Sequence, residues 1–175
     1  MDAAALHIRR AAPNDAEVIV AFNLALAVES ERRRLDRRVV ARGVRRVVAD
    51  PALGVYYVAE RAGSVVGQLL ITFEFSDWRD GTFWWIQSVY VAPACRQQGV
   101  YRALHQHVAQ EARQAGDVCG LRLYVDRRNA RARAVYQRLG LMPTEYHLYE
   151  VDWAQKKGSG TTSGRRRCAP RKRGS

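Results

Sequence analysis

The segment from Tyr90 to Leu104, YVAPACRQQGVYRAL, constrains the fold of this 175-residue chain more than any other. The apolar residues ending in Val89–Val91 predict a β-strand, and Pro93 predicts a short loop after it. Helical spacing of apolar residues from Gly99 onward predicts an amphipathic helix. A strand that leads through a short loop into a helix is typical of domains that mix both element types.

The loop that precedes this helix has the residues expected of an anion-binding turn. The first backbone N–H groups of a helix lack partners within the helix, and its dipole places positive charge at that end. Gly99 allows the backbone to approach a ligand closely, and Arg96 adds a fixed positive charge. The sequence therefore predicts a cofactor that carries a diphosphate.

The rest of the chain predicts alternating helices and strands. Pro13–Asp15 should begin a helix that Asn14 or Asp15 caps, and Asp50–Pro51 should end a second helix. The turn Ala62–Ser64 predicts a hairpin. We expect strands over 7–10, 55–61, 65–75, 82–91, 118–125 and 144–151, with later helices over 36–49, 99–115 and 129–139.

Two motifs resemble those of the GNAT N-acetyltransferase superfamily. Arg96 and Gly99 match its pyrophosphate motif, Q/R-x-x-G-x-G/A, whereas Tyr101 stands where Gly or Ala is usual. A second motif, N-x-x-A-x-x-x-Y-x-x-x-G, is matched by Asn129, Ala132, Tyr136 and Gly140. The resemblance covers roughly residues 6–152. It implies an α/β (α+β) fold with a mixed, mostly antiparallel sheet, flanking helices, and splayed parallel strands at the cofactor cleft.

The resemblance implies transfer of an acetyl group from acetyl-CoA to a primary amine, within a ternary complex and without a metal. Tyr136 would be the general acid, and Asn129 would bond the pantetheine arm. The alternative roles of these two residues are a helix cap for Asn129 and a core aromatic for Tyr136. The full set expected at the cofactor is Val89, Val91, Arg96, Gln97, Gln98, Gly99, Val100, Tyr101, Arg102, Asn129 and Tyr136.

The general base is not identified from the sequence. Many family members carry a Glu on the fourth strand, and Gln87 takes that position here. Because an amide does not accept a proton at neutral pH, Gln87 cannot be the base. Glu74, Asp77, Asp80 or a chain of waters could substitute for it, and each of these acids could equally be a solvated surface residue.

The acceptor amine is also open, and both a small molecule and a peptide fit. The run Phe83–Ile86 suits a central strand covered on both faces, or it could line the acceptor pocket with Tyr56, Phe73 and Trp78. Glu29 and Glu31 could attract a substrate ammonium. Cys95 lacks a nearby base in the sequence, which disfavours a nucleophilic role.

The positive charge of the chain is concentrated in its C-terminal segment. Residues 155–175 carry eight of the 29 basic residues and no acidic ones, which leaves 21 against 17 acidic residues, a surplus of four. This segment is poor in large apolar residues, so we expect a domain over 1–154 and a disordered basic tail over 155–175. The tail could contact nucleic acid, or it could be a solvated extension without a dedicated role.

The remaining expectations concern location and the alternative functions. Three scattered cysteines and the lack of an apolar leader or span predict a cytoplasmic protein that does not associate with a membrane. The sequence leaves open whether the protein forms a homodimer. The first alternative function is an acyl-CoA sensor without turnover, favoured by Gln87 and Tyr101. The second is a nucleic-acid-associated protein directed by its tail.

Overall fold

Five strands form one sheet in the order β1-β2-β3-β4-β5 in the computed structural model, which describes residues 5–153. The first four strands pair antiparallel, and β4 and β5 pair parallel. This is the mixed, mostly antiparallel sheet that the sequence predicts. The strands are β1 (His7–Arg10), β2 (Val55–Arg61), β3 (Ser64–Ser76), β4 (Gly81–Val91) and β5 (Val118–Leu123).

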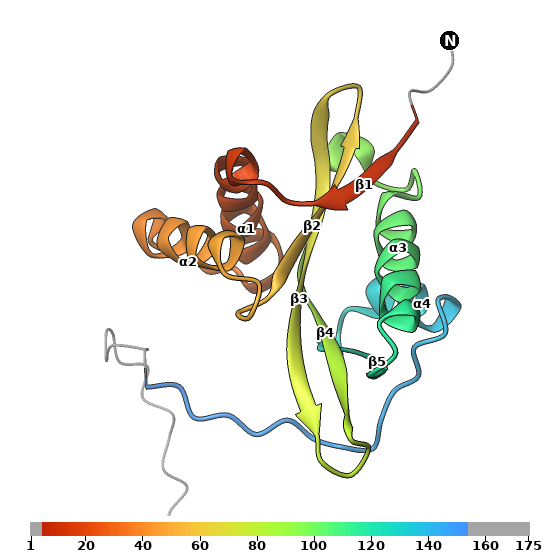
Figure 1. Cartoon of the computed structure of the whole chain (residues 1–175). Coiled ribbons are helices and arrows are strands. Elements are labelled where there is room, and N and C mark those ends of the chain that lie inside the picture. The colour runs from red at the N-terminus through yellow and green to blue at the C-terminus, as the bar shows by residue number, and fades with distance from the viewer. Residues whose placement is uncertain (1–4, 154–175) are drawn as a thin grey trace, which may run out of the picture. The chain divides into compact units, whose positions relative to one another are not determined.

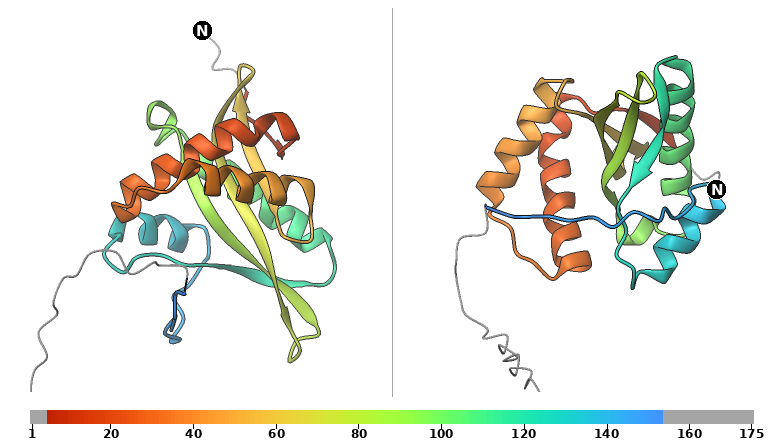
Figure 2. Two further views of the ribbon diagram at one scale, coloured as in Figure 1. Left: turned by 90° about the vertical axis from the view of Figure 1, so that its left-hand side faces the viewer. Right: turned by 90° about the horizontal axis from the view of Figure 1, so that it is seen from below.

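Helices cover both faces of this sheet (Figures 1 and 2). Helices α1 (Ala16–Glu31) and α2 (Arg37–Ala49) contact each other and one face, whereas α3 (Val100–Gln114) contacts all five strands from the opposite face. Helix α4 (Ala130–Arg138) follows β5. One-turn 3-10 helices precede α1 and α3, at η1 (Pro13–Asp15) and η2 (Pro93–Cys95).

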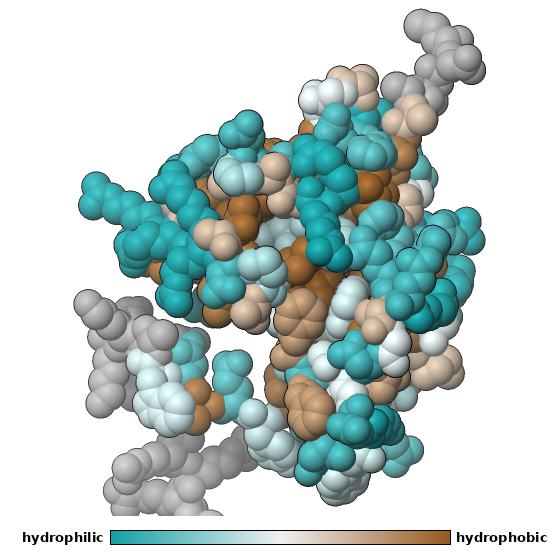
Figure 3. Space-filling model, in the orientation of Figure 1, coloured by the Kyte–Doolittle hydropathy of each residue, from teal (hydrophilic) through white to brown (hydrophobic). Residues whose placement is uncertain are grey.

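Two apolar clusters hold the layers together because successive residues of a strand point to opposite faces of the sheet. On the α3 face, Leu69 and Ile71 of β3 pack with Leu104 of α3. On the α1 face, Leu70 packs with Ile19 of α1. Figure 3 shows the result, with hydrophilic helix surfaces on either side and apolar residues concentrated between them.

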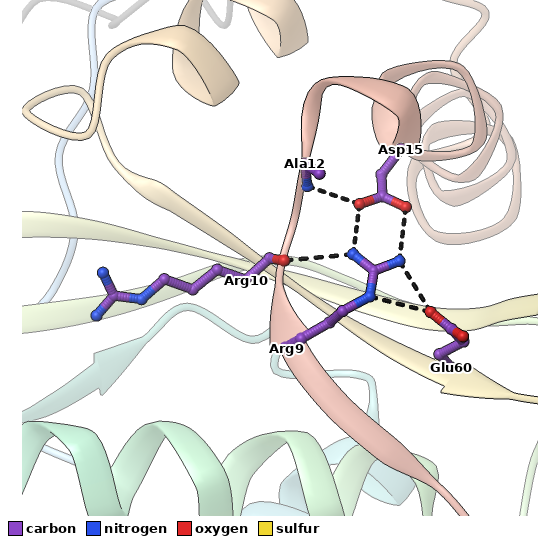
Figure 4. Close-up of polar contacts among 5 residues, drawn as sticks. All are labelled: Arg9, Arg10, Ala12, Asp15 and Glu60. Carbon is purple, nitrogen blue, oxygen red and sulfur yellow. Dashed lines mark hydrogen bonds and ion pairs between the residues drawn. The ribbon is translucent and has the colours of Figure 1, made fainter. Parts of the chain in front are cut away.

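The helix boundaries follow local capping rules in one place and depart from them in another. Asp36 caps α2, and its side chain accepts a hydrogen bond of 2.7 Å from the Arg38 N–H. The prediction that Asn14 or Asp15 caps the first helix is wrong, because neither side chain bonds into α1. The Asp15 carboxylate instead accepts from the Ala12 N–H at 2.7 Å and from Arg9 at 2.6 Å (Figure 4).

The chain divides into two compact units, residues 1–142 and 143–175. In the second unit, residues 143–153 are described and contain no helix or strand, so the strand predicted over 144–151 is wrong. Its alternating sequence satisfies the local pattern of a strand, but a strand also requires a hydrogen-bonded neighbour, and residues 144–151 have none in the described chain. The predicted tail lies outside the described residues.

Candidate active site

A turn and a helix start form the end of the site at which the sequence predicts an anion. After η2, Gln97 and Gly99 adopt positive φ angles of 65° and 79°, and α3 begins at Val100. No side chain caps α3, so the N–H groups of its first turn, at Val100, Tyr101 and Arg102, remain available to a ligand. A diphosphate fits this end of the helix because the N–H groups and the dipole both favour negative charge.

Arg96 lies beside this turn but bonds within the protein. Its Nε donates to the Val91 carbonyl oxygen at 2.9 Å, and its Nη2 pairs with Glu29 of α1 at 2.6 Å. The Tyr90 hydroxyl donates to the other oxygen of Glu29 at 2.8 Å. These hydrogen bonds lower the pKa of Glu29, with the one from Tyr90 contributing most. Glu29 thus holds α1 to the anion-binding turn and is not free to attract a substrate ammonium.

Gln98 is also held in place within the turn. Its side-chain oxygen accepts from Arg61 of β2, and its Nε2 donates to the Ala94 carbonyl at 2.8 Å. The turn is therefore fixed on both sides before a ligand arrives, which reduces the ordering that binding requires.

Next to this turn, the second half of β4 lacks a neighbouring strand on one side. The pairing of β4 with β5 ends at Ile86 opposite Leu123, so the backbone from Gln87 to Val91 has no β5 partner. Ser88 has a positive φ of 48°, and the β3–β4 register shifts at this point. The side chains of Val89 and Val91 pack into the α3-side cluster. The pairing stops where β5 itself ends, at Leu123, so the splaying of the two parallel strands stays a prediction.

Helix α4 brings Tyr136 to the same region. The Tyr136 ring meets the Tyr101 ring edge-on, with centroids 5.7 Å apart. Burial raises the pKa of both phenols, so both keep their protons at neutral pH. The Tyr101 hydroxyl is buried without a hydrogen-bond partner among the described residues. Tyr101, the departure from the family motif, thus lies directly against the expected acid.

Asn129 caps α4, which was one of the two roles that the sequence left open. Its Oδ1 accepts from the Ala132 N–H at 3.0 Å. Within the described chain its Nδ2 makes no hydrogen bond. The cap therefore orients the amide and leaves a donor for a ligand.

A sequence model described as the acetyltransferase (GNAT) family matches residues 19–141. This chain belongs to that family. No curated protein matches.

Solved structures agree with the family assignment. A possible acetyltransferase from Clostridium difficile 630 is 37% identical, with 84% of this chain and 97% of that chain covered and a TM-score of 0.80. A predicted acetyltransferase with acetyl-CoA from Clostridium acetobutylicum is 18% identical, covers 84% and 96%, and has a TM-score of 0.69. A ribosomal-protein-alanine N-acetyltransferase from Brucella melitensis biovar Abortus 2308 is also 18% identical, covers 85% and 99%, and has a TM-score of 0.69. The last two share the fold.

The candidates for a general base in this GNAT domain differ in the hydrogen bonds and ion pairs that they already make. Glu74 is paired with Arg122 at 2.7 Å and accepts from the Trp85 indole N–H. The Asp77 side chain accepts from the Trp78 N–H at 2.9 Å. Gln87 donates from Nε2 to Thr72 Oγ1 at 2.6 Å. Its side-chain carbonyl oxygen, on the same face as Glu74, accepts no hydrogen bond from the described residues. Of these residues, Gln87 alone lies on the stretch of β4 that has no β5 partner.

The aromatic run of β4 divides between the two faces of the GNAT sheet. Trp84 packs against the α3-side cluster and meets Phe73 at 5.8 Å. Trp85 is on the other face and stacks on Tyr124 at 4.4 Å. Tyr56 is buried at 5% exposure, and Trp78 is 89% exposed. The expected aromatic group is therefore not one pocket, and only Trp85 lies near Gln87.

The histidines and cysteines do not form a metal site in the described part of this GNAT chain. His107 contacts Glu111 at 3.0 Å. His105 lines a hollow of about 270 Å³ between α3, β5 and the end of α4. Burial lowers the pKa of His105, which keeps it neutral. None of the described helices is long and apolar enough to cross a membrane.

The sequence motifs do not point to two residues near the site, Tyr90 and Gln68. Tyr90 belongs to the predicted strand, but its hydroxyl bonds to Glu29, which pairs with Arg96. Gln68 is fully buried beside the Ser88 bulge. The one signal for Gln68 was a polar residue inside an otherwise apolar strand, VVGQLLITF.

Proposed function

We propose that this GNAT protein transfers an acetyl group from acetyl-CoA to a primary amine by direct attack within a ternary complex. The observation that carries the proposal is the stretch of β4 from Gln87 to Val91, which pairs with β3 but has no β5 partner and lies next to the N-terminus of α3. A diphosphate at the α3 end would place the rest of an extended cofactor along this stretch. The turn that would hold the diphosphate is already fixed by Arg61, Glu29 and backbone carbonyls.

The chain's own groups match the needs of this chemistry. Acetyl-CoA supplies the thioester. Backbone N–H groups near Val89 and Val91 would bond the pantetheine arm and the thioester oxygen, where negative charge develops. The Asn129 Nδ2 would donate to the same arm. Gln87 offers its carbonyl oxygen to an N–H of the incoming amine, which orients the nitrogen but does not deprotonate it.

Tyr136 would donate a hydrogen bond to the sulfur as the C–S bond breaks. A phenol, with a reference pKa of about 10, is a weaker acid than a thiol at about 8.5, so complete transfer to a free thiolate is unfavourable by about 2 kcal/mol. The overall proton balance is met by the nitrogen, which loses one proton on acylation as the sulfur gains one. Tyr136 therefore stabilises the departing sulfur by its hydrogen bond and keeps its own proton, while the proton that the nitrogen loses reaches the sulfur through solvent.

Replacing Tyr136 by Phe tests its role. We expect kcat to fall by about 100-fold, the lower end of the range for loss of one acid–base group, while the Kd for acetyl-CoA changes less than about threefold. The readout is thiol release across a panel of small amines and peptides, with calorimetric titration of acetyl-CoA. Leu139→Met, at the C-cap of the same helix, is the control for a packing change. Unchanged turnover in a folded Tyr136→Phe protein would remove Tyr136 from the reaction.

The same two measurements separate the alternatives. Acetyl-CoA binding with thiol release for one class of amine establishes the enzyme and its acceptor. Binding without release for any amine supports the acyl-CoA sensor. A folded protein that does not bind acetyl-CoA would refute both the enzyme and the acyl-CoA sensor.

A further inference from the structure

Gln68 lies in the centre of the sheet as a fully buried polar residue. It is 0% exposed in β3 and lies on the face that α1 covers. Its Nε2 donates to Asn23 Oδ1 of α1 at 2.7 Å and to the Ser88 carbonyl oxygen of β4 at 3.2 Å. Gln68 therefore connects the helix of one layer to the bulge in the neighbouring strand.

These contacts close into a ring of four residues. Asn23 Nδ2 donates to the Tyr56 hydroxyl of β2 at 3.0 Å. That hydroxyl also interacts with the Ser88 side chain. Ser88 is thus held through its carbonyl oxygen by Gln68, and its side chain lies next to the Tyr56 hydroxyl.

The ring surrounds the irregular position of β4 in its pairing with β3. Gln68 pairs with Tyr90 and Leu70 with Gln87, so Ser88 and Val89 together face the single residue Leu69. This is a β-bulge, and Ser88 takes the positive φ of 48° that it requires. A bulge re-aims the backbone groups that follow it. Here these groups begin at Val89, on the stretch that lacks a β5 partner.

This arrangement lowers the free energy of unfolding relative to a β3 strand with an apolar residue in place of Gln68. Gln68 Oε1 is buried without a hydrogen-bond partner among the described residues, and a serine at positive φ is strained. A leucine in place of Gln68 would continue the apolar run of β3. Strain and an unsatisfied polar atom at one position are typical of a functional constraint.

We propose that Gln68 is a positioning residue that holds the Ser88 bulge, and with it the backbone N–H that meets the acetyl group of acetyl-CoA. This inference rests on the proposed function, since it assigns the bulge to the thioester. Gln68 does not touch the cofactor, and the diphosphate end of the site lies elsewhere, at the start of α3. Loss of the Nε2 donor should therefore weaken recognition of the acetyl group and leave recognition of CoA intact.

The test compares the affinities of CoA and acetyl-CoA by calorimetry in the wild type and in Gln68→Met. One additional hydrogen bond to the acetyl oxygen predicts that the wild type binds acetyl-CoA about fivefold more tightly than CoA. In Gln68→Met this ratio should fall to about one, while the Kd for CoA itself stays within about twofold. A merely structural role would shift both affinities together or neither.

Two further variants complete the experiment. Leu70→Met changes packing beside the ring, next to Tyr56, but removes none of its hydrogen bonds, so its ratio should equal that of the wild type. Tyr56→Phe removes the hold on the Ser88 side chain and should lower the ratio partway, which keeps the test open if Gln68→Met does not fold.

The outcomes distinguish this inference from the proposed function. An unchanged ratio in folded Gln68→Met, or a wild type with no preference for acetyl-CoA over CoA, overturns the role of Gln68 while CoA binding still stands. A wild type that binds neither compound refutes the proposed function itself.

Discussion

Tyr101 combines two features that seldom occur together, a buried hydroxyl without a partner and a position where the family motif has a small residue. The hydroxyl lies beside Tyr136, and burial raises the pKa of Tyr101 most strongly, with Tyr136 contributing second. Removing an unsatisfied buried hydroxyl relieves its desolvation cost, so Tyr101→Phe should raise the free energy of unfolding by about 1 kcal/mol.

Urea unfolding of Tyr101→Phe measures this change. The N–H of residue 101 is untouched, so the Kd for acetyl-CoA should stay the same. Tyr136→Phe, whose hydroxyl is less enclosed, serves as the matched comparison. A loss of stability in Tyr101→Phe would show that the hydroxyl has a partner in solution.

At the scale of elements, the cluster around Asp15 joins β1 to the start of α1 and to β2. The Arg9 guanidinium contacts Asp15 at 2.6 Å and Glu60 at 2.9 Å (Figure 4). The hydrogen bond from Arg9 is the main cause that lowers the pKa of Asp15 below its ordinary 3.8. A depressed carboxylate pKa contributes stability that is present above the unfolded value and is lost as the pH falls through the folded value.

Asp15→Asn should therefore destabilise the protein by about 2–3 kcal/mol at pH 7, because it leaves a partly buried Arg9 without its nearest charge. The difference from the wild type should begin to shrink as the pH falls below 3.8, where Asp15 of the unfolded chain takes up a proton, and should be smallest below the lowered pKa of Asp15 in the folded protein. Urea melts at pH 7 and at stepwise lower pH measure both effects. Glu17→Gln, at an exposed pair with Arg37, should change stability by less than about 1 kcal/mol. An equal loss for Asp15→Asn at every pH would contradict this account.

At the scale of the whole molecule, the two apolar clusters lie entirely between Leu6 and Leu123. A chain that ends at residue 154 should keep the midpoint of thermal unfolding within about 2 °C and keep its affinity for acetyl-CoA. It should lose any salt-sensitive binding to nucleic acid, because eight of the 29 basic residues lie beyond that point. Thermal melts and titration with duplex DNA at two salt concentrations measure both. Tight DNA binding by the shortened chain would place that activity in the domain.

Local rules of sequence were sufficient for most of the elements. The strand at His7–Arg10 and the helix after Asp36 form where the pattern and the cap predict them. The turn at Gly99 also forms where the sequence predicts it, because glycine adopts a positive φ without strain. In each case the preference is decided by residues a few positions apart, so the sequence alone contains the information.

The sequence by itself determined the family, the order of elements as far as α4 and the turn before α3, since each is encoded within short segments. Only the tertiary structure decided that Arg96 pairs with Glu29, that Tyr101 meets Tyr136, and that Gln68 holds the Ser88 bulge. It also decided against the strand over 144–151, whose alternation was right but whose partner was missing in the described residues. These contacts join residues far apart in the chain, and pairing across such distances depends on which surfaces the fold brings together.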